Sequence, residues 1–251
     1  MTPHVNKRAV ALAFGRAATC YEQHAELQRL SGDALMALAP EKTGSDLLDA
    51  GCGTGWYSRV WRQRGLNVLA FDLSPEMLHQ ARRADSAHAY LAGDIDALPL
   101  LKQSVDVVWS NLAVQWSSDL RRALHQFARV LRPEGTLLFS TLLAGSLQEV
   151  REAWAQLDEG EHVNHFLSEE QVRTAGSDLR LRFERQTLTL HFPSALAAMR
   201  SLKGIGATHL HQGREGALLT RQRLAQLERL WPRDKQGYRL TYHLMYGVTQ
   251  Q

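Results

Sequence analysis

Three glycines, Gly51, Gly53 and Gly55, alternate directly after an apolar segment that contains Asp49. A strand that ends in glycines lets the backbone come close to a ligand at the carboxyl edge of a sheet, where open α/β folds bind cofactors. A dinucleotide site of the G-x-G-x-x-G type would need a further glycine where this chain has Trp56. The loop therefore predicts a cofactor site for a molecule other than a dinucleotide.

A second acidic residue, Asp72, ends the next predicted strand. A carboxylate in this place can accept hydrogen bonds from both ribose hydroxyls of an adenosine, as the corresponding acid does in dinucleotide folds. The alternative is that Asp72 only caps the helix that follows it. Ser74 with Pro75 behind it is the better capping signal, so we expect Asp72 to face a ligand.

The order Asp-x-Gly-x-Gly-x-Gly resembles motif I of the class I methyltransferases that use S-adenosylmethionine. In that family the loop passes under the methionine moiety, and the acid before the first glycine helps to hold it. The pattern also implies that Asp94 accepts from the adenine amino group, the alternative being a simple turn. The cofactor site implied by this resemblance comprises Asp49, Gly51, Cys52, Gly53, Gly55, Asp72, Leu73, Met77, Asp94, Ile95, Asn111, Leu112 and Gln115.

Further segments, largely outside the cofactor pattern, resemble a narrower family, the malonyl-acyl-carrier-protein O-methyltransferases of biotin biosynthesis. They are residues 14–18 with Tyr21 and His24, and residues 111–116, 198–209 and 240–243. The rarest part is the run Arg-Ser-Leu-Lys-Gly-Ile-Gly-Ala-Thr that begins at Arg200. Membership implies methyl transfer to the free carboxylate of malonyl-acyl carrier protein or malonyl-CoA, with S-adenosylhomocysteine as the second product. The methyl ester would prime pimeloyl synthesis.

The proposed acceptor needs no general base, because a malonyl carboxylate is already ionised at pH 7. We expect cationic or phenolic donors to hold one carboxylate oxygen while the other faces the methyl group. The candidates are Tyr21, Arg200, Lys203, His209 and Tyr242, with Trp116 as the roof of the acceptor site. The alternative is a place in the core for the aromatic residues, and a solvated helix face for Arg200 and Lys203, which are three residues apart.

Strands that alternate with helices predict an α/β fold, a Rossmann-like class I methyltransferase with helices on both faces of a mostly parallel seven-stranded sheet. The expected strands are 46–50, 67–72, 88–93, 105–110, 135–143, 180–190 and 239–248. The expected helices are two within 5–39, then 54–64, 75–84, 119–132 and 146–158. We expect one domain, 1–251, with a helical lid at 1–40, a cofactor-binding core at 41–143, and substrate-side insertions and the last strands at 144–251.

The composition of the chain excludes several other classes of protein. Of the 251 residues 44% are hydrophobic, but no apolar run is long enough to cross a membrane, and the N-terminus has no signal-peptide core. Only two cysteines and no HExxH predict a cytoplasmic protein without a metal site. The net charge of +3 includes no dense basic stripe of the kind that binds nucleic acid. The family resemblance implies an acidic acyl carrier protein as the partner, which arginines on the surface would steer.

Two other functions stay open at this point. A small-molecule C- or O-methyltransferase of quinone or polyketide synthesis would place a base near the acceptor and would act without a carrier protein. A non-catalytic regulatory protein would keep the cofactor loop but would have lost turnover. The intact Asp49, Asp72 and three glycines argue against the regulatory protein.

Overall fold

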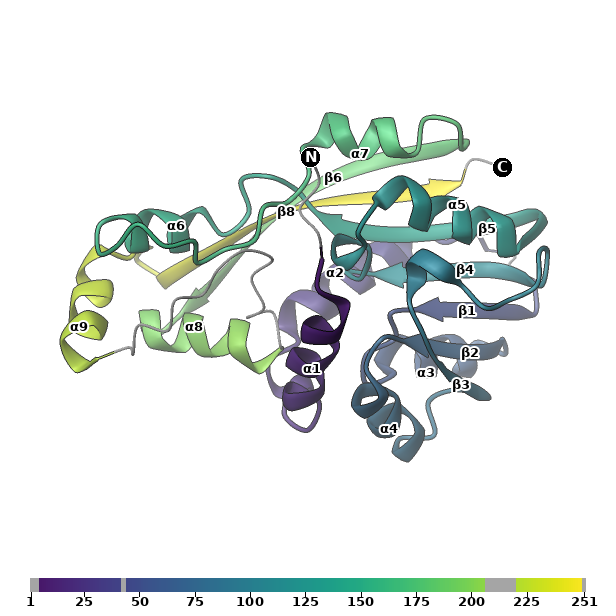
Figure 1. The fold of residues 1–251 in the computed structure, drawn as a ribbon, viewed down its shortest axis with the longest axis horizontal. Helices are drawn as coiled ribbons and strands as arrows, with labels where there is room; N and C mark the ends of the chain where they lie inside the picture. The colour runs from purple at the N-terminus through teal and green to yellow at the C-terminus, as the bar shows by residue number, and fades with distance from the viewer. Residues whose placement is uncertain (1–4, 42–43, 206–219, 250–251) are drawn as a thin grey trace.

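The protein is built around one sheet, seen in a computed structural model that describes residues 5–41, 44–205 and 220–249 (Figure 1). The strands are β1 (Asp46–Ala50), β2 (Asn67–Asp72), β3 (Ala89–Ala92), β4 (Val105–Asn111), β5 (Leu131–Leu142), β6 (Leu181–Phe192), β7 (Arg233–Asp234) and β8 (Gly237–Thr249). Their order is β3-β2-β1-β4-β5-β8-β6, with β7 paired to β8. The first five strands in this order, β3, β2, β1, β4 and β5, are parallel to one another. Strand β8 is antiparallel to both β5 and β6. The expected mostly parallel sheet is confirmed.

Helices cover both faces of this sheet. They are α1 (Lys7–Ala17), α2 (Glu26–Ala37), α3 (Trp56–Gln63), α4 (Pro75–Arg83), α5 (Leu120–Val130), α6 (Gln148–Ala155), α7 (Glu169–Ala175), α8 (Ala195–Gly204) and α9 (Arg221–Leu230). Short 3₁₀ helices are η1 (Tyr21–Gln23), η2 (Ile95–Ala97) and η3 (Val114–Trp116). Successive strand residues point to opposite faces, so Leu47 belongs to the core with α2, α3, α6, α8 and α9, and Leu48 belongs to the core with α5 and α7.

The sheet departs from the prediction in two places. An eighth strand, β7, is present, but it has two residues and only forms a hairpin with β8. Strand β5 begins at Leu131 instead of residue 135, and its pairing with β4 skips from Leu131 to Thr136. Residues 132–134, which the expected start at 135 left outside the strand, therefore belong to a bulge inside it, with Glu134 at φ +62°. A proline fits such a bulge because it has no N–H to give to the ladder.

Helices α7 and α9 were not predicted, and α8 was expected only through the helix face that would carry Arg200 and Lys203. All three lie in residues 144–251, the region expected to hold substrate-side insertions. Each has a side-chain cap, from Ser168, Ser194 and Thr220 respectively. They are short helices, of 7, 10 and 10 residues, so their apolar periodicity gives little signal.

The N-terminal elements lie at the carboxyl edge of the parallel strands. In Figure 1, α1 lies between α4 on one side and α8 on the other. Gly15 of α1 is so close to α4 that a Cβ there would come within 2.6 Å of Glu76 Oε2. On the other side, Cys20 Sγ lies 3.8 Å from the backbone oxygen of Gly204, at the end of α8. Residues 5–37 thus connect the sheet core to the α8 side of the molecule. No helix within the described ranges is long and apolar enough to cross a membrane.

Candidate functional site

The glycine loop turns sharply between β1 and α3. Gly51, Gly53 and Gly55 all have positive φ values, of +89°, +56° and +84°. The backbone N–H groups of Gly51 and Cys52 both donate to the carbonyl of Phe71, at 2.8 and 3.0 Å, which ties the loop to β2. A Cβ on Gly51 would come within 2.2 Å of the Ala113 Cβ. Glycine is needed here both for the left-handed backbone and for the close approach of the loop after β4.

Asp72 holds the same loop from β2. Its Oδ2 accepts from Gly53 N–H and its Oδ1 accepts from Ser74 N–H, both at 2.8 Å. Burial raises the pKa of Asp72, and these N–H groups oppose the rise. The Ser74 hydroxyl caps α4 by accepting from Met77 N–H at 3.3 Å, as expected. Each oxygen of Asp72 keeps a second lone pair, so the carboxylate can still accept from ribose hydroxyls.

Asp49 is a buried carboxyl group with a single described hydrogen-bond partner. Its side chain lies at the end of β1, and Oδ2 accepts from the Ser58 hydroxyl at 2.5 Å. Burial raises the pKa of Asp49 to about 7, and the nearby Asp72 carboxylate adds to the rise while Ser58 opposes it. Such a carboxyl is ready to take up a cationic ligand group, which would stabilise its ionised form.

Two cavities flank the loop and Asp72. The Asp94 cavity has about 590 Å³ of empty space and is lined by Asp72, Leu73, Met77, Asp94 and Ile95, among others. The Arg29 cavity has about 420 Å³ and contains Asp49, the glycine loop and Arg29 of α2. Gly51 and Gly53 line both cavities, so the two cavities form one groove across the loop. The walls of the Asp94 cavity are apolar and acidic, whereas the Arg29 cavity holds a cation, Arg29, and the buried acid Asp49.

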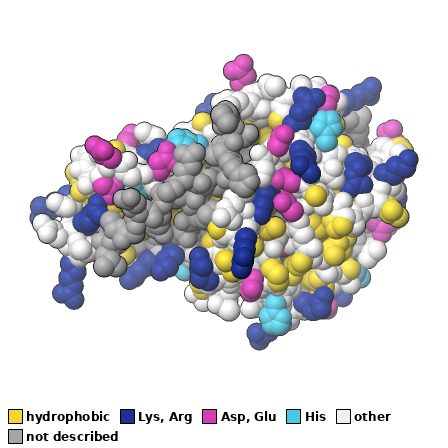
Figure 2. Space-filling model, viewed as in Figure 1, with side chains coloured by type: hydrophobic (Ala, Val, Ile, Leu, Met, Phe, Trp, Pro, Cys, Tyr) yellow, Lys and Arg dark blue, Asp and Glu magenta, His cyan; other side chains and the backbone are white. Residues whose placement is uncertain are grey.

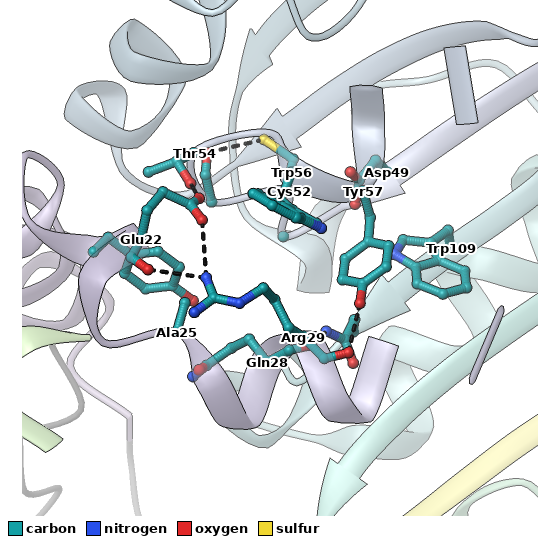
Figure 3. A pocket seen from close by; sticks show the side chains of 14 residues that line it. Glu22, Ala25, Gln28, Arg29, Asp49, Cys52, Thr54, Trp56, Tyr57 and Trp109 are labelled. Atoms are coloured by element: carbon teal, nitrogen blue, oxygen red, sulfur yellow. Dashed lines mark hydrogen bonds and ion pairs between the residues drawn. The ribbon is translucent and has the colours of Figure 1, made fainter. Parts of the chain in front are cut away.

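Arg29 occupies the middle of its cavity. Figure 3 shows it between Glu22 on one side and Asp49, Tyr57 and Trp109 on the other. Its Nη1 donates to the Glu22 carbonyl at 2.9 Å and lies 3.4 Å from Glu22 Oε2, while its guanidinium lies 5.5 Å from the centre of the Trp56 ring. Glu22 Oε1 in turn accepts from the Thr54 hydroxyl. A guanidinium has five N–H donors, so Arg29 can also bind a carboxylate.

A third space, the Tyr242 cavity, has about 660 Å³ and extends from the loop after β4 toward α8. Its walls are mainly apolar and include Leu142, Leu202 and Ile205. Its polar lining residues include Gln28, Gln115, His162, Asn164 and Tyr242. Tyr21 of η1 lines all three cavities, and no hydrogen bond to its hydroxyl is described. Burial raises the pKa of the Tyr21 phenol, and the charges of Asp72 and Glu22 add to the rise, so it stays a protonated donor at neutral pH.

Most of the residues predicted for the cofactor line the two cavities at the loop. Asp94 also accepts from Asp96 N–H at 3.0 Å, so the simple turn considered as the alternative is present, and it accepts from Lys7 Nζ at 2.8 Å. Asn111 lines both cavities, but its amide is bonded to Ser31, Ser140 and the backbone of Gln28. Gln115 lines the Tyr242 cavity instead of the cofactor groove. Gly55 lines neither, and it begins α3 beside Ser86.

The acceptor candidates are less closely grouped. Tyr21, Trp116 and Tyr242 line the Tyr242 cavity, and burial raises the pKa of the Tyr242 phenol. Trp116 also lines the Asp94 cavity and packs edge-on against Phe14, with ring centres 5.3 Å apart. Arg200 and Lys203 are exposed on α8 and are absent from the described lining of all three cavities. His209 lies outside the described residues, and the roles of all these side chains stay predictions.

Arg29, Gln28 and His162 were not predicted. Arg29 and Gln28 reach the site because α2 packs against the sheet edge, which no local motif signals. His162 lines the Tyr242 cavity with its ring stacked on Trp154, at a centre distance of 3.9 Å, and Nε2 lies 2.8 Å from Asp158 Oδ1. The only available signal was the spacing of four residues between Asp158 and His162.

The comparisons with solved structures show the fold. A chain in the Haloferax volcanii complex between the Trm112 methyltransferase activator and a methyltransferase superposes with a TM-score of 0.62 at 24% identity, covering 96% of this chain and 98% of that one. A Bacillus halodurans protein described as a methyltransferase gives 0.61 at 17% identity, covering 86% and 96%. The Rossmann-like class I methyltransferase fold predicted from the sequence is confirmed.

The sequence comparisons show the family. Residues 48–139 match a family model described as "Methyltransferase domain". A relative from Erwinia billingiae, named malonyl-[acyl-carrier protein] O-methyltransferase, is 56% identical, and the match covers 97% of each chain. A relative of the same name from Salmonella typhimurium is 53% identical, and the match covers 98% of each chain. With about half of its residues identical to these relatives over nearly its whole length, the chain belongs to the malonyl-[acyl-carrier protein] O-methyltransferase family.

Proposed function

We propose that this enzyme transfers the methyl group of S-adenosylmethionine to the free carboxylate of a malonyl group on acyl carrier protein, the substrate in its relatives' names. The observation that supports this best is that one phenol, Tyr21, lines the cofactor groove and the Tyr242 cavity at once. A donor and an acceptor bound in these spaces would meet beside it. The product, a malonyl methyl ester, has lost its charge and suits fatty-acid-type elongation toward biotin.

The cofactor would lie along the groove with its two ends in different surroundings. The adenosine suits the Asp94 cavity, where Asp72 can accept from the ribose and Asp94 from the adenine amino group. The methionine end suits the Arg29 cavity, which holds a buried acid for the ammonium group, Asp49, and a cation for the carboxylate, Arg29. The sulfonium would then lie near Gly53 and Tyr21, at the entrance to the Tyr242 cavity. Bound there, S-adenosylmethionine supplies an electrophilic methyl group.

The residues of the acceptor cavity do not need to remove a proton. The malonyl carboxylate is ionised at neutral pH, so its grip and orientation matter more than base catalysis. Tyr21 can donate to one carboxylate oxygen without withdrawing as much charge as a bidentate arginine would. The apolar walls of Leu142, Leu202 and Ile205 exclude water around the reacting oxygen. His162 offers a further polar contact for the thioester.

A substrate series at controlled pH tests this function. Under single-turnover conditions with saturating cofactor, malonyl-carrier should be methylated and acetyl-carrier should not, since it has no carboxylate. The rate of the chemical step should vary less than about threefold between pH 6 and 8, because no base titrates. A single-proton rise across that range, or methylation of acetyl-carrier, would contradict the proposal.

The affinity for the cofactor should change with pH, unlike the chemical step. The pKa of Asp49 is raised to about 7 in the free protein, and a cationic ligand favours the ionised form. Binding must therefore release a proton, and affinity should rise about fivefold from pH 6 to pH 7. Calorimetry in buffers of different ionisation enthalpy measures the released proton, and Asp49→Asn should remove the pH dependence. Above pH 7 the ammonium of the cofactor itself begins to titrate, so the range below pH 7 is the informative one.

The Arg29→Ala variant should bind S-adenosylmethionine about 10- to 100-fold more weakly, as expected when a charged hydrogen bond is lost. Methylthioadenosine, which lacks the amino-acid end, should bind the variant and the unmodified protein equally well. Arg64→Ala is a matched control, because Arg64 also lies over a tryptophan, with its guanidinium 5.4 Å from the Trp61 ring, but lines none of the three cavities. Equal losses for both ligands would show that Arg29 acts on the fold of α2 instead.

A further inference from the structure

Helix α8 presents two different faces. Ala195 and Ala198 are fully buried, and Leu202 at the same helical spacing lines the Tyr242 cavity together with Ile205 just beyond the helix. Arg200 and Lys203, three residues apart, are exposed. One helix thus forms the inner wall of the acceptor cavity and also places two cations on the outer surface beside it.

These two cations are here called the α8 cation pair. Neither Arg200 nor Lys203 forms an ion pair in the described part of the chain, whereas Arg121 and Arg173 elsewhere on the surface pair with carboxylates at 2.9 Å. The acid that approaches α8 from α9, Glu228, accepts from the N–H groups at the opposite, N-terminal end of the helix, at 3.1 and 3.2 Å. In Figure 2, Lys and Arg side chains gather along the lower edge of the part that contains α8 and α9.

We propose that the α8 cation pair is part of the docking surface for the acidic acyl carrier protein that presents the malonyl thioester. The inference rests on the proposed function and assigns its partner to a particular surface. Charge complementarity favours an acidic protein over other partners and would act mainly on the rate of encounter. Because α8 also lines the acceptor cavity, a carrier bound on its outer face would hold its thioester arm close to that cavity. The exposed position of the pair suits this role better than a direct grip on the malonyl carboxylate.

The double charge reversal Arg200→Glu with Lys203→Glu tests the proposal. With malonyl-carrier at low ionic strength, kcat/KM should fall at least about tenfold, mainly through KM, since rim charges act on association. With malonyl-N-acetylcysteamine, a thioester without any protein, kcat/KM should stay within about twofold of the unmodified enzyme. In about 0.5 M salt the difference between variant and unmodified enzyme on malonyl-carrier should shrink, because exposed charges are then screened.

Arg180→Glu provides a matched control. Arg180 is exposed, forms no described ion pair, and precedes β6 at the end opposite to the one that leads into α8. The 12 residues of that strand separate Arg180 from the start of α8 by about 40 Å. This variant should keep normal kinetics with both substrates.

The possible results separate the docking role from the function itself. An unchanged KM for malonyl-carrier in the double reversal would overturn the docking role. An equal loss with the carrier and with the short thioester would also overturn it, and would return Arg200 and Lys203 to the acceptor cavity. Failure of the unmodified enzyme to methylate either malonyl substrate would instead refute the proposed function.

Discussion

The Gly53→Val variant should lose measurable binding of S-adenosylmethionine, a loss of at least about 100-fold in affinity or about 2.7 kcal/mol. The residue has φ +56°, a left-handed conformation that a β-branched side chain rarely adopts. A Cβ built there points toward open space, with Tyr21 Cε1 as the nearest atom at 3.8 Å. The valine branches would therefore fill the groove between the loop and Tyr21, where the methionine end of the cofactor is proposed to lie.

Gly65→Val separates the backbone effect from the filling of the groove. Gly65 has φ +91°, and a Cβ there would have no atom within 4 Å. It lies in the turn between α3 and β2 and lines none of the three cavities. Both variants should lose thermal stability, but only Gly53→Val should lose cofactor affinity by calorimetry. Near-normal binding by a folded Gly53→Val protein would mean that the methionine moiety lies elsewhere.

The cofactor half of the fold could be predicted because its signals are local. The strands at 46–50 and 67–72 agree with the structure to the residue. Each has an apolar centre, and the first is followed by Gly51 while the second ends at Asp72. The helix after Ser74 was marked by a hydroxyl cap and a proline at the first position. Where a helix or strand is marked by such neighbouring residues, the sequence alone is enough.

The rest of the site depends on contacts between distant segments. Arg29 reaches the glycine loop only because α2 packs against the sheet edge, where Asn111 bonds to the backbone of Gln28 at 2.9 Å. The three-residue spacing of Arg200 and Lys203 correctly predicted that they share one face of a helix. It could not predict whether that face is buried or exposed. The burial of Ala195 and Ala198 against the core decides that, and it depends on the whole packing of α8.

The Tyr21→Phe variant should lower kcat/KM for malonyl-carrier by about 10- to 100-fold, through the loss of one hydrogen bond to a charged group. In the unmodified protein, burial and the neighbouring carboxylates raise the pKa of Tyr21, so its phenol is a protonated donor throughout the neutral range. The phenyl ring would keep the wall shared by the cofactor groove and the Tyr242 cavity intact. The affinity for S-adenosylmethionine should therefore change less than about twofold, by calorimetry, while the chemical step slows.

Tyr57→Phe is the comparison that makes this result specific. The Tyr57 hydroxyl lies 2.6 Å from the Arg29 carbonyl oxygen and 2.8 Å from Asp33 Oδ1, and can donate its one proton to either acceptor. The side chain lines the Arg29 cavity but not the Tyr242 cavity. Loss of the Tyr57 hydroxyl should loosen α2 and therefore lower thermal stability or cofactor affinity. The value of kcat at saturating cofactor should stay nearly unchanged. If Tyr21→Phe shows the same pattern as Tyr57→Phe, then Tyr21 holds the N-terminal helices and the cofactor. The malonyl carboxylate would then be gripped by another side chain of the Tyr242 cavity.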